Sequence, residues 1–291
     1  MDQQLFIFIT VAEKKNFSRA AEELHMTQPA VSQYIQALER TMGTKLLERS
    51  NKYVRLNKAG EIVYHHAKEI LGLYTKMHYL IDDLTNNTSG PLAIGASYTY
   101  GEYVLPHLLA KMQEKYPAIN PTISIGNTKE IAELVLGHQL DVGIVEGNFK
   151  DKNLQIEPFA VDYMSIVASP NHSLAQKNNE ITLSDLTEAT WIVREIGSGT
   201  REAVENMFEQ YEISPKKKLE FGSTQIIKEA VEANLGISLL SDWTIRKEIS
   251  LGTLKVIHVN GIAITREFST VLCSPFQTKA LKVFLDMIKK N

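Results

Sequence analysis

The chain has 291 residues, of which 44% are hydrophobic and 22% are charged, and its formal net charge is −3. This length exceeds one ordinary hydrophobic core, so we expect two or three domains. The single cysteine, Cys273, excludes an intramolecular disulfide framework and a cysteine-based zinc site.

The amino-terminal stretch has no basic region before its apolar residues, so it does not read as a signal peptide. No apolar run is long enough to span a bilayer, and we expect a cytoplasmic protein without a membrane partner. Residues 1–58 carry nine Lys or Arg against six Asp or Glu, a net +3, so the remainder carries −6. A basic head on an acidic body favours a protein whose head binds DNA.

The first 49 residues predict three helices. Between Phe17 and Arg49 the helical period gives a short helix capped by Ser18, a break at His25, and a longer helix capped by Thr27. Before them, a first amphipathic helix is marked by Leu5, Phe6, Phe8, Ile9 and Ala12.

The longer helix has an unusually polar outer face. Its first turn contains Pro29, where a missing N–H costs nothing. Ala30, Val31, Ile35 and Leu38 turn inward, while Gln28, Ser32, Gln33 and Gln36 face outward. Uncharged amides and hydroxyls can donate to and accept from base edges in a major groove. The alternative is an ordinary pair of helices with a polar surface.

A hairpin is predicted next, from strands at Leu46-Leu47 and Tyr53–Leu56 joined by the turn at residues 50–52. Three cations, Arg49, Lys52 and Arg55, lie near its tip. In a wing of this form such cations contact phosphates and add affinity that is independent of sequence. An ordinary solvated hairpin is the alternative interpretation.

A long helix follows, with apolar positions recurring at spacings of four and three. This heptad seam predicts a partner helix, and a two-fold dimer is the simplest one, because it would place two heads on one duplex. Packing against the chain's own body is the competing interpretation. We interpret His66 as setting register or reaching solvent rather than as a metal ligand. The seam consists of Ala59, Val63, His66, Ile70, Leu73, Met77, Leu80 and Leu84.

Beyond the linker at residues 86–91, short β runs alternate with helices, which predicts a doubly wound α/β body of two lobes with a ligand cleft. The predicted strands are Leu92–Ala96, Thr122–Ile125, Val142–Val145, Met164–Ala168, Trp191–Val193, Leu219–Phe221, Ile237–Leu240, Lys255–Val259 and Phe268–Cys273. The predicted helices lie near Tyr103–Tyr116, Thr128–Leu136, Leu183–Leu186, Arg201–Tyr211, Gln225–Ala233, Asp242–Glu248 and Thr278–Lys290.

These residues resemble the LysR-type transcriptional regulators over the whole chain. The segment FSRAAEELHMTQPAVSQYIQALERTMGTKLLERS is similar to the family's winged helix-turn-helix almost position for position, and LPHLLAKMQEKYP, HQLDVGIVEG, SPNHSLA and EANLGISLLSDW are similar to its effector domain. The resemblance implies a homodimer or homotetramer that bends promoter DNA and binds a small co-inducer between two Rossmann-like lobes. REIGSGTRE and ASYTYGEYVLP look most like regulators of sulfur assimilation and of carbon fixation.

Two helix openings rich in Ser and Thr are the candidate effector site. Free N–H groups and hydroxyls at a helix start can hold a small anion, and glycines at 197 and 199 permit close approach. In the family these openings face each other, so we expect contacts from Ser97, Thr99, Tyr100, Ser198, Gly199 and Thr200, and weaker ones from Thr128 and from Ser223-Thr224. The alternative is that these residues only cap helices.

Glu146 bears on the prediction that the ligand is an anion. A carboxylate lining the cleft would repel an anion unless Arg194 or Arg201 paired with it. It could instead select a ligand that bears a hydrogen-bond donor.

Other function classes fit less well. GSGT lacks the GxSxG elbow and the Gly-Lys-Ser/Thr ending of a P-loop, and the eight histidines form no HExxH pair. A stand-alone solute-binding protein or an enzyme on a two-lobed fold is the alternative to a regulator, but the first would carry an export signal and neither needs the head.

We therefore expect an all-α winged helix-turn-helix head, a coiled-coil linker helix and a periplasmic-binding-protein-like α/β effector domain. The predicted boundaries are 1–58, 59–89 and 90–291, with lobe I at about 90–162 and 266–291 and lobe II at about 163–265. Expected partners are double-stranded promoter DNA, an anionic effector, a second copy of the chain and RNA polymerase; no cofactor or metal is expected. Activation with self-repression is the family expectation. The expected DNA-binding residues are Ser18, Thr27, Gln28, Pro29, Ser32, Gln33, Gln36, Arg49, Lys52 and Arg55.

Overall fold

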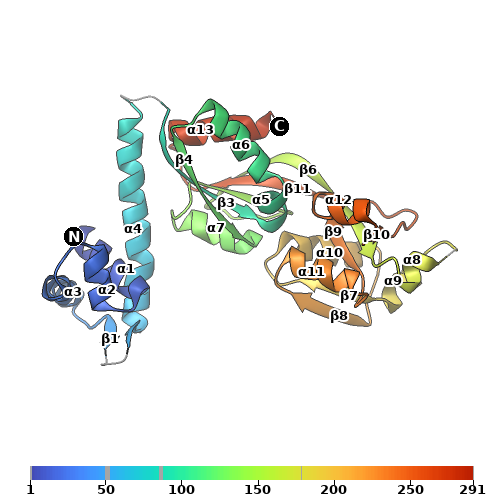
Figure 1. Ribbon diagram of the computed structural model, residues 1–291, viewed down its shortest axis with the longest axis horizontal. Coiled ribbons are helices and arrows are strands. Elements are labelled where there is room, and N and C mark those ends of the chain that lie inside the picture. The colour runs from blue at the N-terminus through green and yellow to red at the C-terminus, as the bar shows by residue number, and fades with distance from the viewer. Residues whose placement is uncertain (1, 50–52, 85–87, 178, 291) are drawn as a thin grey trace. The chain divides into compact units, whose positions relative to one another are not determined.

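The structure, a computed structural model, describes residues 2–49, 53–84, 88–177 and 179–290 (Figure 1). It divides into two compact units. The head unit comprises residues 1–85 with 137–139, and the α/β unit comprises 86–136 with 140–291. Among the described residues, no helix is both long enough and apolar enough to cross a membrane.

The head unit begins with three helices around one apolar core, as predicted. Phe8, Val31 and Ile35 are fully buried in it, whereas Phe6, which we expected to turn inward, is 54% exposed. The helices are α1 (Asp2–Lys14), α2 (Phe17–Glu23) and α3 (Gln28–Met42).

The predicted cap of α2 is wrong by two residues. Asn16 is extended, with φ −160° and ψ 125°, and its side chain accepts hydrogen bonds from the backbone N–H groups of Ser18 and Arg19. Ser18 therefore lies inside the first turn, with its side chain exposed. An Asn side chain caps a helix as well as Ser does, and choosing Asn16 brings Phe17 into the helix.

The break and the second cap are confirmed. His25 takes the left-handed conformation, with φ 50°, directly after α2. Thr27 then caps α3, its hydroxyl accepting from the N–H of Ala30 at 3.4 Å. At the other end Gly43, with φ 71°, closes α3 in the left-handed region that glycine favours.

The predicted hairpin is present as β1 (Leu47–Arg49) and β2 (Val54–Leu56), paired antiparallel with Glu48 opposite Arg55. The turn at residues 50–52, including Lys52, lies outside the described residues. Asn57 then caps α4 (Lys58–Asp82), the long helix of Figure 1.

Helix α4 is buried at one end only. Ala67 is 1% exposed and belongs to the head core, where α4 packs against α1. Most of the predicted seam beyond this point is open to solvent: Ile70 is 51% exposed, Leu73 45% and Met77 46%. We call Ile62, Ile70, Leu73, Tyr74, Met77, Ile81 and Leu84 the α4 stripe.

The first lobe of the α/β unit is a parallel sheet with strand order β4-β3-β5. Helices α6 and α13 cover one face and α7 covers the other, each over its own apolar cluster (Figure 1). The elements are β3 (Gly90–Ser97), α5 (Tyr98–Tyr103), α6 (Leu105–Lys115), β4 (Ile119–Gly126), α7 (Thr128–Leu136), β5 (Val142–Glu146) and α13 (Lys279–Lys289).

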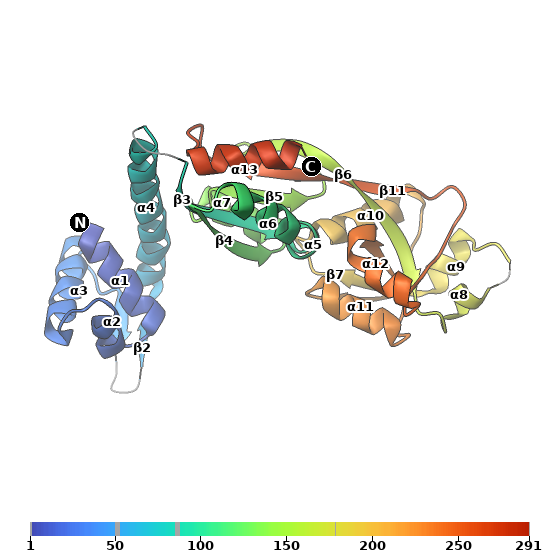
Figure 2. The ribbon, with the colours of Figure 1, turned by 45° about the horizontal axis from the view of Figure 1, so that its top comes forward.

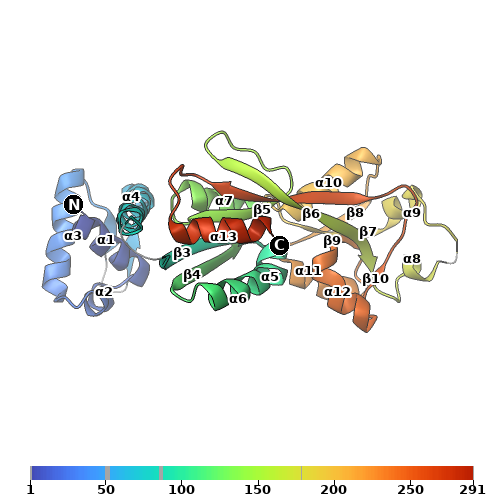
Figure 3. The ribbon, with the colours of Figure 1, turned by 90° about the horizontal axis from the view of Figure 1, so that it is seen from above.

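Two long antiparallel strands, β6 (Gln155–Ala168) and β11 (Ile264–Leu272), connect the lobes. They run side by side from one lobe to the other (Figures 2 and 3). The predicted strands at 164–168 and 268–273 cover only part of them. Pro158 and Asp162 interrupt the apolar pattern of β6, and Arg266 interrupts that of β11, so periodicity alone could not extend either strand.

The second lobe is built on the far end of β6, where β9 and β10 pair with it. One apolar cluster lies under α10 and another under α11 and α12. The elements are α8 (Ser173–Gln176), α9 (Leu183–Glu188), β7 (Thr190–Arg194), α10 (Gly199–Gln210), β8 (Lys217–Phe221), α11 (Thr224–Glu232), β9 (Ser238–Ser241), α12 (Asp242–Leu251) and β10 (Lys255–Val256).

Candidate functional site

The outward face of α3 carries the side chains that we expect to read bases. Gln33 and Gln36 are exposed, and the amide of Gln28 donates to the hydroxyl of half-buried Ser32 at 3.0 Å. Thr27 and Pro29 are exposed at the start of the helix. The face therefore offers donors and acceptors without charge, on a helix whose opposite side is fixed in the core.

The two described cations of the hairpin, Arg49 and Arg55, are paired within the head, which the sequence did not indicate. Arg55 contacts Glu48 at 2.6 Å, and this hydrogen bond raises the pKa of the arginine. Arg49 stacks over the ring of Phe17 at 4.5 Å and lies 3.5 Å from Glu39. To contact a DNA phosphate, each arginine must either bind the phosphate and its carboxylate partner together or leave that partner for the phosphate.

Glu39 holds the hairpin to α3. Its side chain is 3% exposed. The carboxylate accepts hydrogen bonds from the backbone N–H of Leu46 at 3.0 Å and from the ammonium group of Lys45 at 3.1 Å. Burial opposes the charge, but these hydrogen bonds and Arg49 outweigh it and lower the pKa of Glu39 below 4.5.

In the α/β unit the two predicted helix openings converge on one guanidinium. Arg266, on β11, donates to the hydroxyl of Thr99 at 2.8 Å and to that of Thr200 at 2.9 Å. Thr99 starts α5 of the first lobe and Thr200 starts α10 of the second. All three residues are at most 5% exposed.

Glu146 occupies the α5 opening. One carboxylate oxygen accepts from the N–H groups of Thr99 at 2.9 Å and Tyr100 at 3.4 Å, and the other lies 2.6 Å from Arg266. Burial raises the pKa of the Tyr100 hydroxyl to about 12, so it stays protonated. The helix start thus binds a carboxylate of its own chain.

The predicted partners of Glu146 were wrong. Arg194 pairs with Glu195 at 2.7 Å, and Arg201 pairs with Glu205 at 2.6 Å and with Glu220 at 3.0 Å. Arg266, which we did not expect, neutralises Glu146 instead.

A second carboxylate shares the same guanidinium. Asp162, on β6, is fully buried and lies 2.8 Å from Nε of Arg266, and it accepts from the hydroxyl of Ser241 at 2.7 Å. Burial raises the pKa of Asp162 above its ordinary value, although Arg266 and Ser241 act in the opposite direction. Two buried carboxylates therefore surround one cation.

The remaining predicted residues lie beside this cluster. Ser97 and Thr128 are in hydroxyl contact at 3.2 Å, and the Thr128 hydroxyl donates to the carbonyl of Glu146 at 3.1 Å. Ser198 caps α10, accepting from the N–H of Thr200 at 3.2 Å. A Cβ on Gly199 would meet that Glu146 carbonyl at 2.2 Å, so only glycine fits there.

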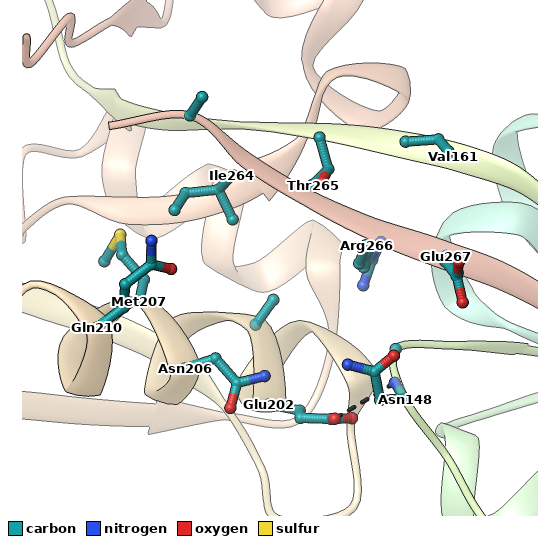
Figure 4. A pocket seen from close by; sticks show the side chains of 13 residues that line it. Asn148, Val161, Glu202, Asn206, Met207, Gln210, Ile264, Thr265, Arg266 and Glu267 are labelled. Carbon is teal, nitrogen blue, oxygen red and sulfur yellow. Dashed lines mark hydrogen bonds between the residues drawn. The ribbon is translucent and has the colours of Figure 1, made fainter. Parts of the chain in front are cut away.

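Two cavities open next to the cluster. One of about 300 Å³ is lined by Thr128, Ser198 and Gly199, with Lys129 and Phe149 beside them. The other, of about 360 Å³, lies between α10 and β11 (Figure 4). In Figure 4 its α10 wall carries Glu202, Asn206 and Gln210, its β11 wall carries Ile264, Thr265 and Glu267, and Glu202 accepts from the N–H of Asn148 at 3.3 Å.

Ser223 and Thr224, the weaker candidates, take a different role. Ser223 caps α11, and the Thr224 hydroxyl accepts from Arg194 at 3.4 Å. Arg194 in turn stacks over Tyr98 at 4.5 Å. These contacts tie the second lobe to α5 away from Arg266.

Comparisons with known proteins match both units. The family of bacterial regulatory helix-turn-helix proteins of the lysR type matches residues 3–61, and the LysR substrate binding domain matches residues 85–291. The HTH-type transcriptional regulator CysL of Bacillus subtilis (strain 168) is 40% identical over 98% of this chain and 95% of its own length. A probable RuBisCO transcriptional regulator of Trieres chinensis is 33% identical over 97% of this chain and 94% of its own.

A solved structure matches the α/β unit in fold. The regulatory domain of Synechocystis PCC6803 CcmR in complex with 2-PG is 29% identical, with a TM-score of 0.63 over 69% of this chain and 97% of that domain.

Proposed function

Because this chain belongs to the LysR family of DNA-binding transcriptional regulators, we propose that α3 reads its promoter and that a ligand at the Arg266 cluster controls the response. Members of the family act by binding and are not enzymes. A regulator of promoters works where the chromosome is, so we place the protein in the cytoplasm.

DNA contact in this proposal is divided by chemistry. Gln28, Ser32, Gln33 and Gln36 specify bases, while Thr27 with Pro29, Ser18 and the hairpin cations position the helix on phosphates. The α4 stripe pairs with a second copy, so that two heads meet one duplex, and two such dimers form the tetramer.

The observation that carries the ligand site is that Arg266 holds Thr99 and Thr200 at the same time. Hydroxyls and helix openings from both lobes are thereby within reach of one small molecule. The cavity beside Thr128, Ser198 and Gly199 gives it a place to enter.

The charges of the cluster restrict the chemistry of this ligand. Glu146 and Asp162 are buried at 2% and 0% exposure against the single cation Arg266, so a ligand that brings another full negative charge without a proton is disfavoured. We infer a small oxyanion or carboxylate that keeps a proton, a hydroxyl or an amine. It accepts from the Thr hydroxyls and donates to Glu146.

Such a ligand acts only if it binds one arrangement of the lobes better than another. In the described structure Arg266 donates to both threonine hydroxyls, so a ligand whose oxygens draw the guanidinium away breaks these hydrogen bonds and changes the contact between lobes. The changed contact between the lobes then alters how the dimers are arranged on DNA and how they contact RNA polymerase.

The regulated genes in this proposal belong to sulfur or carbon assimilation. The likeness to CysL and to a probable RuBisCO transcriptional regulator supports this assignment. The protein activates its target genes and represses its own.

The test is a calorimetric titration of the full chain with sulfur oxyanions, phosphorylated sugars and small carboxylates. Thr99→Ala and Thr200→Ala should leave promoter affinity unchanged and weaken binding of the active ligand about tenfold, since each removes one hydrogen bond to it. Thr187→Ala, which removes an exposed hydroxyl bonded to its own helix, is the control. Wild-type ligand affinity in both variants would exclude this site.

A further inference from the structure

Three metal-binding side chains meet on α4, outside every site described above. Nε2 of His65 lies 3.4 Å from one carboxylate oxygen of Glu69, and Nδ1 of His66 lies 2.7 Å from the other. The three donor atoms fall within 4.8 Å of one another. They are the one such group of His, Cys, Asp and Glu in the part of the chain that the structure describes.

The spacing along α4 explains how two histidines that are adjacent in sequence can both contact Glu69. Glu69 is one helical turn from both histidines, at i+4 from His65 and i+3 from His66, and side chains at these spacings are neighbours on a helix. The carboxylate therefore lies between two imidazoles, whose ring centroids are 5.3 Å apart.

The donor set selects a metal. Two imidazoles and a carboxylate suit Zn²⁺ and related transition ions, whereas Ca²⁺ and Mg²⁺ prefer oxygen ligands. Ligands about 2.1 Å from a tetrahedral Zn²⁺ stand about 3.4 Å apart, so donors already within 4.8 Å need only small side-chain rotations.

The three residues are available for this role. The side chains of His65 and His66 are 62% and 63% exposed, and the described contacts of both rings are with each other and with Glu69. The nearest cation in sequence, Lys68, is already bound to Glu13 and to the hydroxyl of Tyr64. An entering metal replaces the two His–Glu69 contacts, and the described contacts between these three side chains and the rest of the chain stay as they are.

We propose that α4 carries a site for a divalent transition metal of the Zn²⁺ class, held by His65 Nε2, His66 Nδ1 and the Glu69 carboxylate. Water completes the coordination on the solvent side. An ion at this site links successive turns of α4, and His66 lies four residues from both Ile62 and Ile70 of the α4 stripe. The site is independent of the ligand cluster of the α/β unit.

The experiment is a Co²⁺ titration of the full chain without an affinity tag, followed by visible absorption, with Zn²⁺ as competitor. Wild-type protein should bind one Co²⁺ per chain with the strong visible bands of a four-coordinate ion, and Zn²⁺ should abolish them. His66→Ala and Glu69→Gln should each weaken binding at least about tenfold, since each removes one of three protein ligands.

His78→Ala is the matched control, because His78 is exposed on the same helix and its ring packs against that of Tyr74. It should bind Co²⁺ as the wild type does. Equal affinity in wild type, His66→Ala and Glu69→Gln would overturn the site, as would a weak six-coordinate spectrum that none of the substitutions changes. His66 and His78 are exposed and Glu69 is half-buried, and a thermal melt verifies that each variant is folded.

Discussion

At the scale of single residues, one buried arginine joins parts of the chain that are far apart in sequence. Arg266 bonds Thr99 across 167 positions and Thr200 across 66, and it pairs with Asp162 across 104. Buried charges are tolerated when each has partners of good geometry, and removing one member leaves the others unpaired. The stability of the α/β unit and the ligand response that we propose for it therefore depend on the same side chain.

Replacing this arginine tests that dependence. Arg266→Met keeps the length of the side chain but leaves Glu146 and Asp162 without a cation, so we expect a loss of about 3–5 kcal/mol in the free energy of unfolding. Urea unfolding followed by fluorescence measures it. Lys289→Met, which removes an exposed cation paired with Glu157, should cost less than about 1 kcal/mol. Similar losses in the two variants would contradict the structural role of Arg266.

The pH dependence of the head follows from Glu39. Its pKa lies below 4.5 in the folded protein, so the charged form contributes stability that is fully present above the unfolded value and is lost as pH falls through the folded one. The melting temperature of the head should thus drop as the pH falls below about 4.5. Glu39→Gln should lower it at pH 7 and flatten this drop, which melting curves from pH 3 to 7 can show. A drop of equal size in the variant would assign it to other carboxyls.

Half of the candidate ligand cluster could be found from residue types alone. Thr99 and Thr200 lie between a predicted strand and the predicted helix that follows it, which is a local pattern. For Arg266 and Asp162 the one local signal is a charged residue at an inward-facing position of a strand whose side chains alternate between two faces. Arg266 shares the inward face of β11 with Phe268 and Thr270. Their partners are set by the register of β6 against β11, which periodicity does not contain.

At the scale of elements, the two kinds of DNA contact that we propose belong to different elements of the head. Gln33 and Gln36 lie on its exposed face, while Arg55 lies on the hairpin and is held by Glu48. We expect Gln33→Ala to reduce discrimination between promoter and unrelated DNA, at a cost of about 1–3 kcal/mol on the promoter only. Binding isotherms on both DNAs at one salt concentration measure the ratio. An unchanged ratio would remove Gln33 from base reading.

Arg55→Ala should weaken binding to both DNAs alike and lower the salt dependence of binding by about one counterion. Its control is Lys115→Ala, which removes a cation from the end of α6 in the α/β unit. A loss confined to the promoter would instead give Arg55 a base contact.

The start of α10 depends on one glycine. A methyl group on Gly199 would meet the carbonyl of Glu146 at 2.2 Å, and a backbone atom cannot move aside as a side chain can. Gly199→Ala should therefore cost about 1–3 kcal/mol by displacing α10 from β5, and it should weaken ligand binding with it. Gly222→Ala has open space around its Cβ and should do neither. Thermal unfolding and calorimetry provide both readouts.

Elements with a long apolar period were predictable, and short or interrupted ones were not. The pattern placed α3, α4 and α10 within a few residues of their ends. It missed α8, which has four residues, and the first half of β6, where Pro158 and two charges hide the alternation. The predicted N-cap of α2, Ser18, lies two residues after the observed one, Asn16, because both residue types can cap a helix.

At the scale of the whole molecule, the α4 stripe is the clearest unpaired surface of the head unit. Ile62 is 57% exposed and Ile81 55%, which a monomer has no reason to keep on one helix. Leu73→Glu should break the pairing of chains and give a monomer in sedimentation at micromolar concentration. Leu251→Glu, at a site that is 75% exposed in the α/β unit, should leave the oligomer intact. An unchanged mass for Leu73→Glu would place the contact elsewhere.

The sequence predicted two units of different kind, because the net charge and the periodicity of apolar residues both change along the chain. The head could be assigned from its helices and its +3 charge, and the α/β unit from alternation of strands and helices. What was not visible is that β6 and β11 form one continuous ladder between the lobes, because that depends on pairing between segments about a hundred residues apart.

That ladder decides what kind of movement is open to the effector domain. Two strands paired from Gln155 with Leu272 to Met164 with Ile264 cannot bend sharply in their own plane without losing hydrogen bonds. Between the residues of β11 that pair with β5 and those of β6 that pair with β9, they form a two-stranded segment, which can change its twist and keep its hydrogen bonds. The single irregularity, between Phe268 and Ser269, lies two residues from Arg266. The ligand that we propose at that arginine would therefore act on the twist between the two lobes of the α/β unit rather than on the distance between them.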